Sequence, residues 1–293
     1  MGQVNHRRLK TALFFLLACS ALPTVQGAQE NSADYADWGG AFTQPEGDRL
    51  WQGLALGFFG EREIIESDKQ RVIRIEAPAR AENDALVPVQ IHTELPEGFS
   101  AAIQNIYLTV DINPSPMAAK FTVSPTRNPE YIATRVRVNG YTYIRAIAEM
   151  TDGTLYMDKQ WVKSRGAGCS APPGTNQEQA KASLGNMRFK FSQALESSQN
   201  QSKAVQLMIS HPNNTGMQRD QLSTMLIPQS YVKEVEVSFN DERLLKAETS
   251  FTISENPSFR FKFAPDESGE LVARMRDTDD KEFYLYQTIK ADE

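Results

Sequence analysis

Apolar and polar residues alternate along most of this chain, and a period of two restricts the fold to one built from β-strands. Successive side chains of a strand point to opposite faces of a sheet, so an alternating segment buries one face and leaves the other polar. The pattern begins near Arg71 and is cleanest where Phe259, Phe261 and Phe263 alternate with charged residues. The other strand-like runs lie at 87–91, 106–112, 121–123, 131–138, 141–148, 155–162, 189–191, 205–209, 235–239, 271–275 and 282–289.

Turn-forming residues separate these runs, and no long helical segment lies between them. Asn139-Gly140 predicts a hairpin between the runs at 131–138 and 141–148, because both positions of such a turn need positive φ. Short strands with frequent turns predict an antiparallel β-sandwich. Further turn sequences are Pro96-Glu97-Gly98, Asn113-Pro114-Ser115-Pro116 and Asp152-Gly153.

One short helix and one break interrupt the β pattern. Apolar residues with nearly helical spacing predict a short amphipathic helix at 48–59. Residues 164–179 lack an apolar period and are rich in Gly, Pro, Ser and Asn, which is typical of a flexible linker. We therefore expect an all-β protein with a short N-terminal helix, a β-sandwich at 46–164, a linker at 165–181 and a second β-sandwich at 182–293.

The N-terminus has the order of regions found in a secretory signal peptide. A basic run precedes the apolar stretch 11–20, and small residues follow it up to Gly27. The apolar stretch is too short for a membrane span, which needs about 20 residues. We expect export with removal of residues 1–27, followed by a mobile leader at 28–45. A lipoprotein signal with acylation of Cys19 is the alternative.

Charge and motif content exclude several classes of function. Loss of three basic residues with the signal peptide moves the formal charge from −6 to −9. An acidic chain without a basic stripe is not expected to bind nucleic acid. The two remaining histidines, His92 and His211, have no cysteine or acidic cluster at metal-ligand spacing, so no metal or other cofactor is expected. Phosphate-binding and nucleophile-elbow motifs are absent from the sequence.

Cys169 is the one cysteine left after removal of the signal peptide. A lone thiol in an oxidising compartment indicates intermolecular pairing or a reactive thiol, whereas a buried cysteine acting as a small hydrophobe is the alternative. Because linker composition offers no core, we expect the thiol to be exposed. A mobile arm cannot hold a base in position, so a catalytic nucleophile is not expected. Gly166, Ala167 and Gly168 would instead let the thiol travel with a covalently bound group. A linker cysteine without function fits these residues equally well.

Segments on both sides of the linker carry a resemblance to a known family. Before it lie Ala81-Glu-Asn-Asp-Ala-Leu-Val-Pro-Val, Asn113-Pro-Ser-Pro-Met-Ala-Ala-Lys-Phe, Ala133-Thr-Arg-Val-Arg-Val and Val162-Lys-Ser-Arg-Gly-Ala-Gly-Cys. After it lie Ser210-His-Pro-Asn-Asn-Thr-Gly, Ile227-Pro and Ile253-Ser-Glu-Asn-Pro-Ser-Phe-Arg-Phe-Lys-Phe. The first set resembles SoxY, the carrier subunit of the periplasmic sulfur-oxidation system, and the second resembles SoxZ. The chain thus resembles a fused SoxYZ-like carrier of the kind associated with quinoprotein dehydrogenases.

The resemblance implies a fold, a site and partners. It implies immunoglobulin-like sandwiches for both halves and a periplasmic, non-catalytic carrier that holds sulfur intermediates on Cys169. Sulfur-oxidation enzymes, or a quinoprotein dehydrogenase and its cytochrome, would be the partners. Unlike the free C-terminal arm of SoxY, this arm continues through Pro172-Pro173 into a second domain, which stiffens and shortens its reach. The alternatives are an accessory docking module without covalent cargo and, less consistent with the absence of Cys-x-x-Cys, a thiol redox protein.

Overall fold

The computed structural model describes residues 42–96, 98–124, 129–174, 177–193, 203–263, 265 and 267–290. The chain separates into two units, 1–37 and 38–293, and every described residue belongs to the second. The expected signal peptide, Cys19 and the leader up to residue 41 lie outside the described residues. Among the described helices, none has the length and apolar character needed to cross a membrane.

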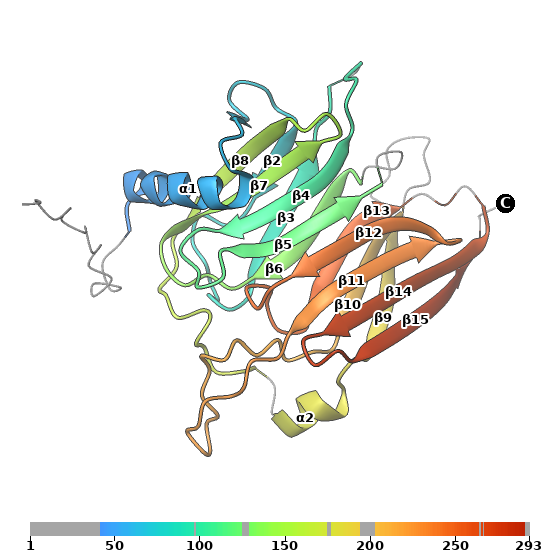
Figure 1. The fold of residues 1–293 in the computed structure, drawn as a ribbon. Coiled ribbons are helices and arrows are strands. Elements are labelled where there is room, and N and C mark those ends of the chain that lie inside the picture. Colours follow the sequence, from blue (N-terminus) through green and yellow to red (C-terminus); the bar gives the residue numbers. More distant parts are fainter. Residues whose placement is uncertain are drawn as a thin grey trace, which may run out of the picture. The chain divides into compact units, whose positions relative to one another are not determined.

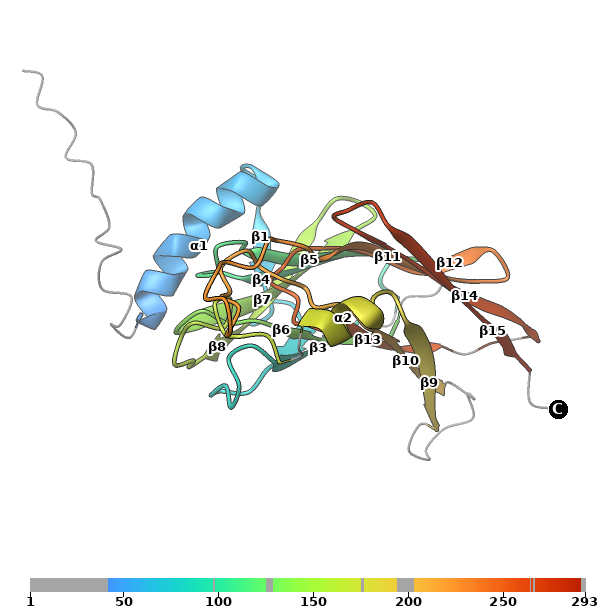
Figure 2. The ribbon, with the colours of Figure 1, turned by 90° about the horizontal axis from the view of Figure 1, so that it is seen from below.

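Two β-sheets enclose the core of the described residues, as Figures 1 and 2 show. The nine-stranded sheet has the order β1 (Ile64–Glu66), β8 (Leu155–Val162), β7 (Thr142–Met150), β4 (Ile103–Val110), β5 (Met117–Val123), β12 (Glu242–Thr249), β11 (Val232–Phe239), β14 (Gly269–Asp277), β15 (Glu282–Ile289). The six-stranded sheet has the order β2 (Ile73–Glu76), β3 (Val87–Thr93), β6 (Tyr131–Val136), β13 (Ser258–Phe263), β10 (Lys203–Ile209), β9 (Met187–Gln193). The pairs are antiparallel except β1 with β8. The all-β prediction with two sandwich halves and a short N-terminal helix is confirmed.

Both sheets continue from the first half of the chain into the second. Strand β5 pairs with β12, and strand β6 pairs with β13. Phe121 of β5 and Phe259 of β13 meet edge to face across the core, with ring centroids 6.1 Å apart. The halves are therefore joined by backbone hydrogen bonds and by shared core, in addition to the covalent linker.

The predicted hairpin at Asn139-Gly140 is wrong. The strands before and after it, β6 and β7, belong to different sheets, so this segment crosses from one layer to the other. Neither residue has positive φ. The tight hairpin between β11 and β12 lies instead at Asn240 and Asp241, whose φ values of 47° and 65° suit a two-residue turn.

Helix α1 (Gln44–Phe59) covers the outer face of the nine-stranded sheet (Figure 2). It begins four residues before the predicted helix, with a capping box between Thr43 and Glu46. Trp51 and Phe59 pack on Ile147, which points away from the main core. Leu155 and Met157 of β8 belong to the same buried cluster, and the Tyr107 ring packs edge to face on Phe59. Strand β7 is therefore buried on both faces.

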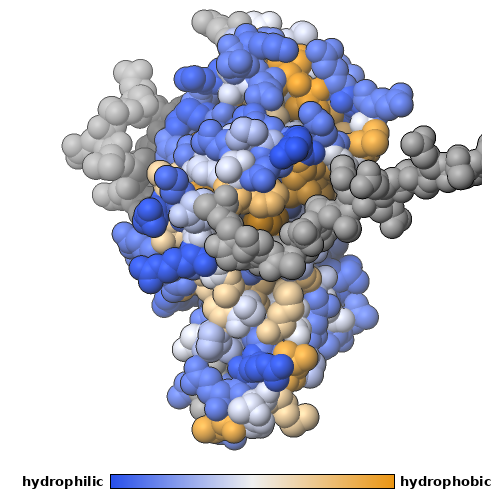
Figure 3. Space-filling view, turned by 90° about the vertical axis from the view of Figure 1, so that its left-hand side faces the viewer, coloured by the Kyte–Doolittle hydropathy of each residue, from blue (hydrophilic) through white to orange (hydrophobic). Residues whose placement is uncertain are grey.

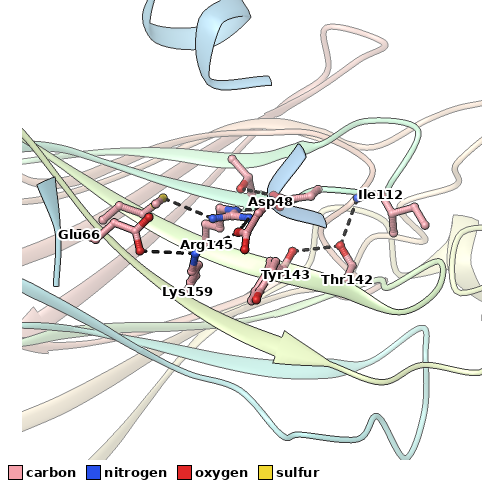
Figure 4. Close-up of polar contacts among 10 residues, drawn as sticks. Asp48, Glu66, Ile112, Thr142, Tyr143, Arg145 and Lys159 are labelled. Atoms are coloured by element: carbon pink, nitrogen blue, oxygen red, sulfur yellow. Dashed lines mark hydrogen bonds and ion pairs between the residues drawn. The ribbon is translucent and has the colours of Figure 1, made fainter. Parts of the chain in front are cut away.

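A charged cluster anchors the start of α1 to the sheet (Figure 4). The fully buried Arg145 of β7 donates from Nε to Asp111 at 2.7 Å and from a terminal nitrogen to Asp48 of α1 at 3.1 Å. Its guanidinium lies between the rings of Trp51 and Tyr143, 4.6 Å from each centroid. Burial raises the pKa of Asp111 to about 6, although Arg145 acts in the opposite direction.

The face of the molecule in Figure 3 is largely hydrophilic, with hydrophobic residues gathered in a few places. Large exposed apolar side chains occur on α1, at Leu56 and Phe58, and on the loop before β11. The loop carries Leu222, Met225 and Leu226. This loop continues from residues 215–218, whose side chains contact the segment around Cys169.

Candidate functional site

Cys169 is buried, with 1% of its surface exposed, and it is free of any disulfide. The prediction of an exposed thiol is therefore wrong. The segment from Gly166 to Ala171 folds back onto the ends of the strands from both halves. Linker composition gives no sign of this docking, because the hydrogen-bonding partners are side chains about 30 or more residues away in the sequence.

Gly168 brings the arm into close contact with the first half. A Cβ atom at this position would lie 2.3 Å from the carbonyl oxygen of Asp84 and 2.4 Å from that of Val138. Real side chains cannot approach so closely, so only glycine permits this docking. The bend before it places Gly166 at φ 98° and Ala167 at φ 66°. The three residues predicted as a flexible arm thus form a folded, close-packed turn.

The loop 211–218 of the second half holds the arm from the other side. The Thr215 hydroxyl donates to the carbonyl oxygen of Cys169 at 2.6 Å. The Gln218 amide donates to the carbonyl oxygen of Ala171 at 3.0 Å and accepts from the Thr215 backbone N–H at 3.0 Å. From the first half, the Asn139 side chain accepts the Cys169 N–H at 3.3 Å. We call these contacts from Asn139, Thr215 and Gln218 the cysteine clamp.

Burial makes the Cys169 thiol a poor nucleophile in this arrangement. Desolvation raises its pKa from 9.0 to about 11, and the nearby positive charge of Arg137 only partly opposes the shift. The thiolate is the reactive form of cysteine, so the docked thiol is almost entirely inactive at neutral pH. Chemistry at Cys169 requires the arm to leave the clamp.

Arg137 is a second buried charge at the site, which the sequence pattern did not reveal. Only 1% of its surface is exposed. One terminal nitrogen donates to the carbonyl oxygen of Gly168 at 3.4 Å and the other to that of Asn213 at 3.1 Å. Its Nε has no hydrogen-bond partner. The sequence pattern predicts one strand at 131–138, in which Arg137 would lie on the same polar face as Arg135. In the structure β6 ends at Val136, so Arg137 lies beyond the strand and does not follow its alternation.

His211 organises the loop that forms the clamp. Its Nδ1 accepts the backbone N–H of Asn213 at 3.0 Å, and its Nε2 faces buried Asp277 at 3.7 Å. Burial lowers the pKa of His211, while the Asp277 carboxylate opposes the shift. His92 lies apart from this loop, on β3, 3.4 Å from Glu76. In the described part of the chain, no group of three or more His, Cys, Asp or Glu residues could hold a metal ion.

Two family matches cover the two halves in order. Residues 56–169 match the family described as "Sulfur oxidation protein SoxY", and residues 191–285 match "Sulphur oxidation protein SoxZ". The chain is a fused SoxYZ-like protein. Its domains are of the carrier type found in sulfur oxidation, and such domains imply sulfur-oxidation enzymes as partners. The cysteine clamp thus joins the SoxY-like half to the SoxZ-like half.

The other comparisons add no functional information. No curated protein matches the chain significantly. A superoxide reductase (neelaredoxin) from Ignicoccus hospitalis shows 17% identity and a TM-score of 0.29, and the match covers 34% of this chain and 94% of the reductase chain. A β-glycosidase from Bacteroides vulgatus shows 9% identity and a TM-score of 0.22, over 74% of this chain and 25% of its own.

Proposed function

We propose that this SoxYZ-like protein is a non-catalytic periplasmic carrier that holds a sulfur-containing intermediate covalently on Cys169. The observation that carries the proposal is the end of the SoxY match, which falls on Cys169 itself. In this proposal, residues 46–164 form the SoxY-like domain, 165–181 the linker with the arm Gly166–Gly168, and 182–293 the SoxZ-like domain. Residues 1–27 direct export.

The docked arm represents the resting state of the proposed carrier. Non-covalent contacts hold it in place, namely the cysteine clamp and the close packing of Gly168. Each such hydrogen bond stabilises by only about 1 kcal/mol net, so the arm can leave without unfolding the sheets. A partner enzyme then reacts with the released thiol. Sulfur-oxidation enzymes are the first candidates, and a quinoprotein dehydrogenase with its cytochrome is the second.

Loading with tetrathionate tests the carrier proposal without a partner enzyme. The Cys169 thiolate attacks an inner sulfur of tetrathionate, breaks the central S–S bond and forms Cys169 Sγ–S–SO₃⁻ with release of thiosulfate, so tetrathionate itself is the oxidant. Intact-mass and peptide measurements should find this addition on Cys169 and none at this site in Cys169→Ser. Thiosulfate with a two-electron-accepting partner should give the same product. Failure of Cys169 to load under both conditions would contradict the proposal.

The burial of Cys169 favours one second candidate, an accessory docking module without covalent cargo. In that case the cysteine packs as a small hydrophobe within the interface of the halves. An activity assay reconstituted with the partner distinguishes the two functions. The assay measures sulfur oxidation or dehydrogenase activity, according to the partner. Cys169→Ser should abolish activity of a carrier and leave that of a docking module intact.

A further inference from the structure

Arg137 is buried without the charge compensation that the fold gives its other buried arginine. Arg145 has the carboxylates of Asp111 and Asp48 within 3.1 Å and two aromatic rings on its faces. Arg137 has two carbonyl oxygens, an Nε without a partner, and no ion pair with any described carboxylate. An unpaired buried charge is costly, and an anion bound beside Arg137 would offset that cost.

The anion that Arg137 can meet lies at Cys169. The guanidinium already contacts the carbonyl oxygen of Gly168, the residue before the cysteine. The charges of Cys169 and Glu255 act on the pKa of Arg137, which burial lowers and these charges raise. The Glu255 carboxylate is engaged by the Gly174 backbone N–H at 2.9 Å. The unloaded thiol is protonated at neutral pH and supplies no charge, so in the empty carrier Arg137 has the more distant Glu255 charge and no ion pair.

We propose that Arg137 is a positioning residue that binds a negative charge carried on the Cys169 sulfur and retains an anionic loaded arm against the protein. This inference rests on the proposed covalent loading of Cys169. Its Nε–H and terminal N–H groups can donate together to the oxygens of a sulfonate, a strong arrangement because the hydrogen bonds are charge-assisted. A neutral group on the same sulfur receives no such stabilisation. Charge on the cargo thereby sets how readily the arm is released.

Two adducts on the Cys169 sulfur, one anionic and one neutral, test this role. Tetrathionate gives Cys169 Sγ–S–SO₃⁻ with release of thiosulfate, and methyl methanethiosulfonate gives the disulfide Cys169 Sγ–S–CH₃ with release of methanesulfinate. Each adduct is reduced with dithiothreitol in native buffer and in urea, and the urea-to-native rate ratio gives its protection by the fold. We expect protection of the anionic adduct to exceed that of the methyl adduct by about tenfold or more. Equal protection of the two adducts would overturn the inference.

Variants at position 137 assign the effect to the guanidinium. Arg137→Gln should make the protection of the two adducts equal, whereas Arg137→Lys, which keeps the charge, should restore part of the difference. A difference that persists undiminished in folded Arg137→Gln overturns the role of Arg137. If Arg137→Gln does not fold, the inference is tested by comparing the protection of the two adducts in the wild-type chain and in Arg137→Lys. A chain that does not load at Cys169 contradicts the proposed function, whereas a chain that loads without charge discrimination contradicts only this inference.

Discussion

In the proposed carrier, Cys169 combines an attachment site with protection from unwanted chemistry. A lone thiol in an oxidising compartment is exposed to oxidation and to dimerisation through an intermolecular disulfide. Both reactions depend on thiolate character and access. Docking of the arm reduces both thiolate character and access, because the side chain is buried and desolvation favours the protonated thiol. The burial is thus compatible with a carrier that exposes its thiol only with a partner.

The raised pKa of Cys169 predicts a pH dependence of thiol reactivity and of stability. A shift from 9.0 to about 11 reduces the thiolate fraction at pH 8 by about a hundredfold relative to the unfolded chain. Alkylation of the Cys169 peptide by iodoacetamide should therefore be at least about a hundredfold slower in native buffer than in urea. Because the folded pKa is the higher one, the folded state binds the proton more tightly. The associated stability, about 2–3 kcal/mol, is present below pH 9 and is lost as the pH rises to 11.

Two measurements check this behaviour. Rates of alkylation at pH 7 to 11 are followed by peptide mass, which separates Cys169 from Cys19. Denaturant unfolding over the same range, compared with Cys169→Ser, isolates the contribution of the thiol to the free energy of unfolding. Equal native and urea rates at pH 8 would show that the thiol is not buried in solution.

At the scale of elements, the arm is a glycine-dependent turn held between two loops. Gly168→Ala places a Cβ atom against two backbone carbonyl oxygens, neither of which can move without the strand ends. Overpacking of this kind costs about 1–3 kcal/mol, so we expect the arm to undock and alkylation of Cys169 at pH 8 to become about ten- to a hundredfold faster. Gly53→Ala is the matched control, since a Cβ there meets nothing within 4 Å. Unchanged reactivity in Gly168→Ala would mean that close packing does not hold the arm.

Local patterns predicted the elements better than their arrangement. Alternation located most strands, because the two faces of each strand have different surroundings. Strand β12 was missed, since its first two residues, Glu242 and Arg243, are both exposed and obscure the pattern. The hairpin at Asn139-Gly140 failed for a related reason. Asn and Gly allow the chain to form a tight turn there. The side chain of Asn113, distant in sequence, instead accepts the Asn139 N–H where the chain crosses from one sheet to the other.

The site was predictable only in part. Cys169 could be singled out because it is the one thiol outside the expected signal peptide. Its burial depends on Thr215 and Gln218, about 50 residues further along the chain, and nothing near the cysteine encodes those contacts. Arg137 was hidden for the opposite reason, since a local pattern placed it on the wrong face. The burial of Cys169 was missed because its partners are distant in the sequence, and the burial of Arg137 was missed because β6 ends before it.

The whole molecule is organised by sheets that cross from one half to the other. Strand pairs β5–β12 and β6–β13 bury main-chain groups of both halves, and Phe121 packs on Phe259 across the layers. Separation would leave four strand edges without partners and would expose shared core. The halves should therefore unfold as one cooperative unit, unlike two sandwiches connected by a linker alone.

The tryptophans provide a direct measurement of this coupling. Trp51 and Trp161 lie on α1 and β8 of the first half, and Trp38 lies outside the described residues. No tryptophan lies in the second half of the sequence, so changes in tryptophan fluorescence report on the first half. Leu271→Ala removes a fully buried side chain from β14 in the second half. The cavity should cost about 2–5 kcal/mol and lower the unfolding midpoint by about 5–15 °C. Glu270→Ala, at the exposed neighbouring position, is the matched control and should leave the midpoint within about 1–2 °C.

Coincidence of two probes decides whether the halves unfold together. In Leu271→Ala, tryptophan fluorescence and far-ultraviolet circular dichroism should shift by the same amount, as expected for a two-state transition. A fluorescence midpoint that stays at the wild-type value while the dichroism midpoint falls would mean that the halves unfold independently. Coupling has a consequence for the site as well, because the cysteine clamp takes Asn139 from one half and Thr215 from the other. A destabilised SoxZ-like half should then release Cys169 more often, and alkylation at pH 8 should be faster in Leu271→Ala than in Glu270→Ala.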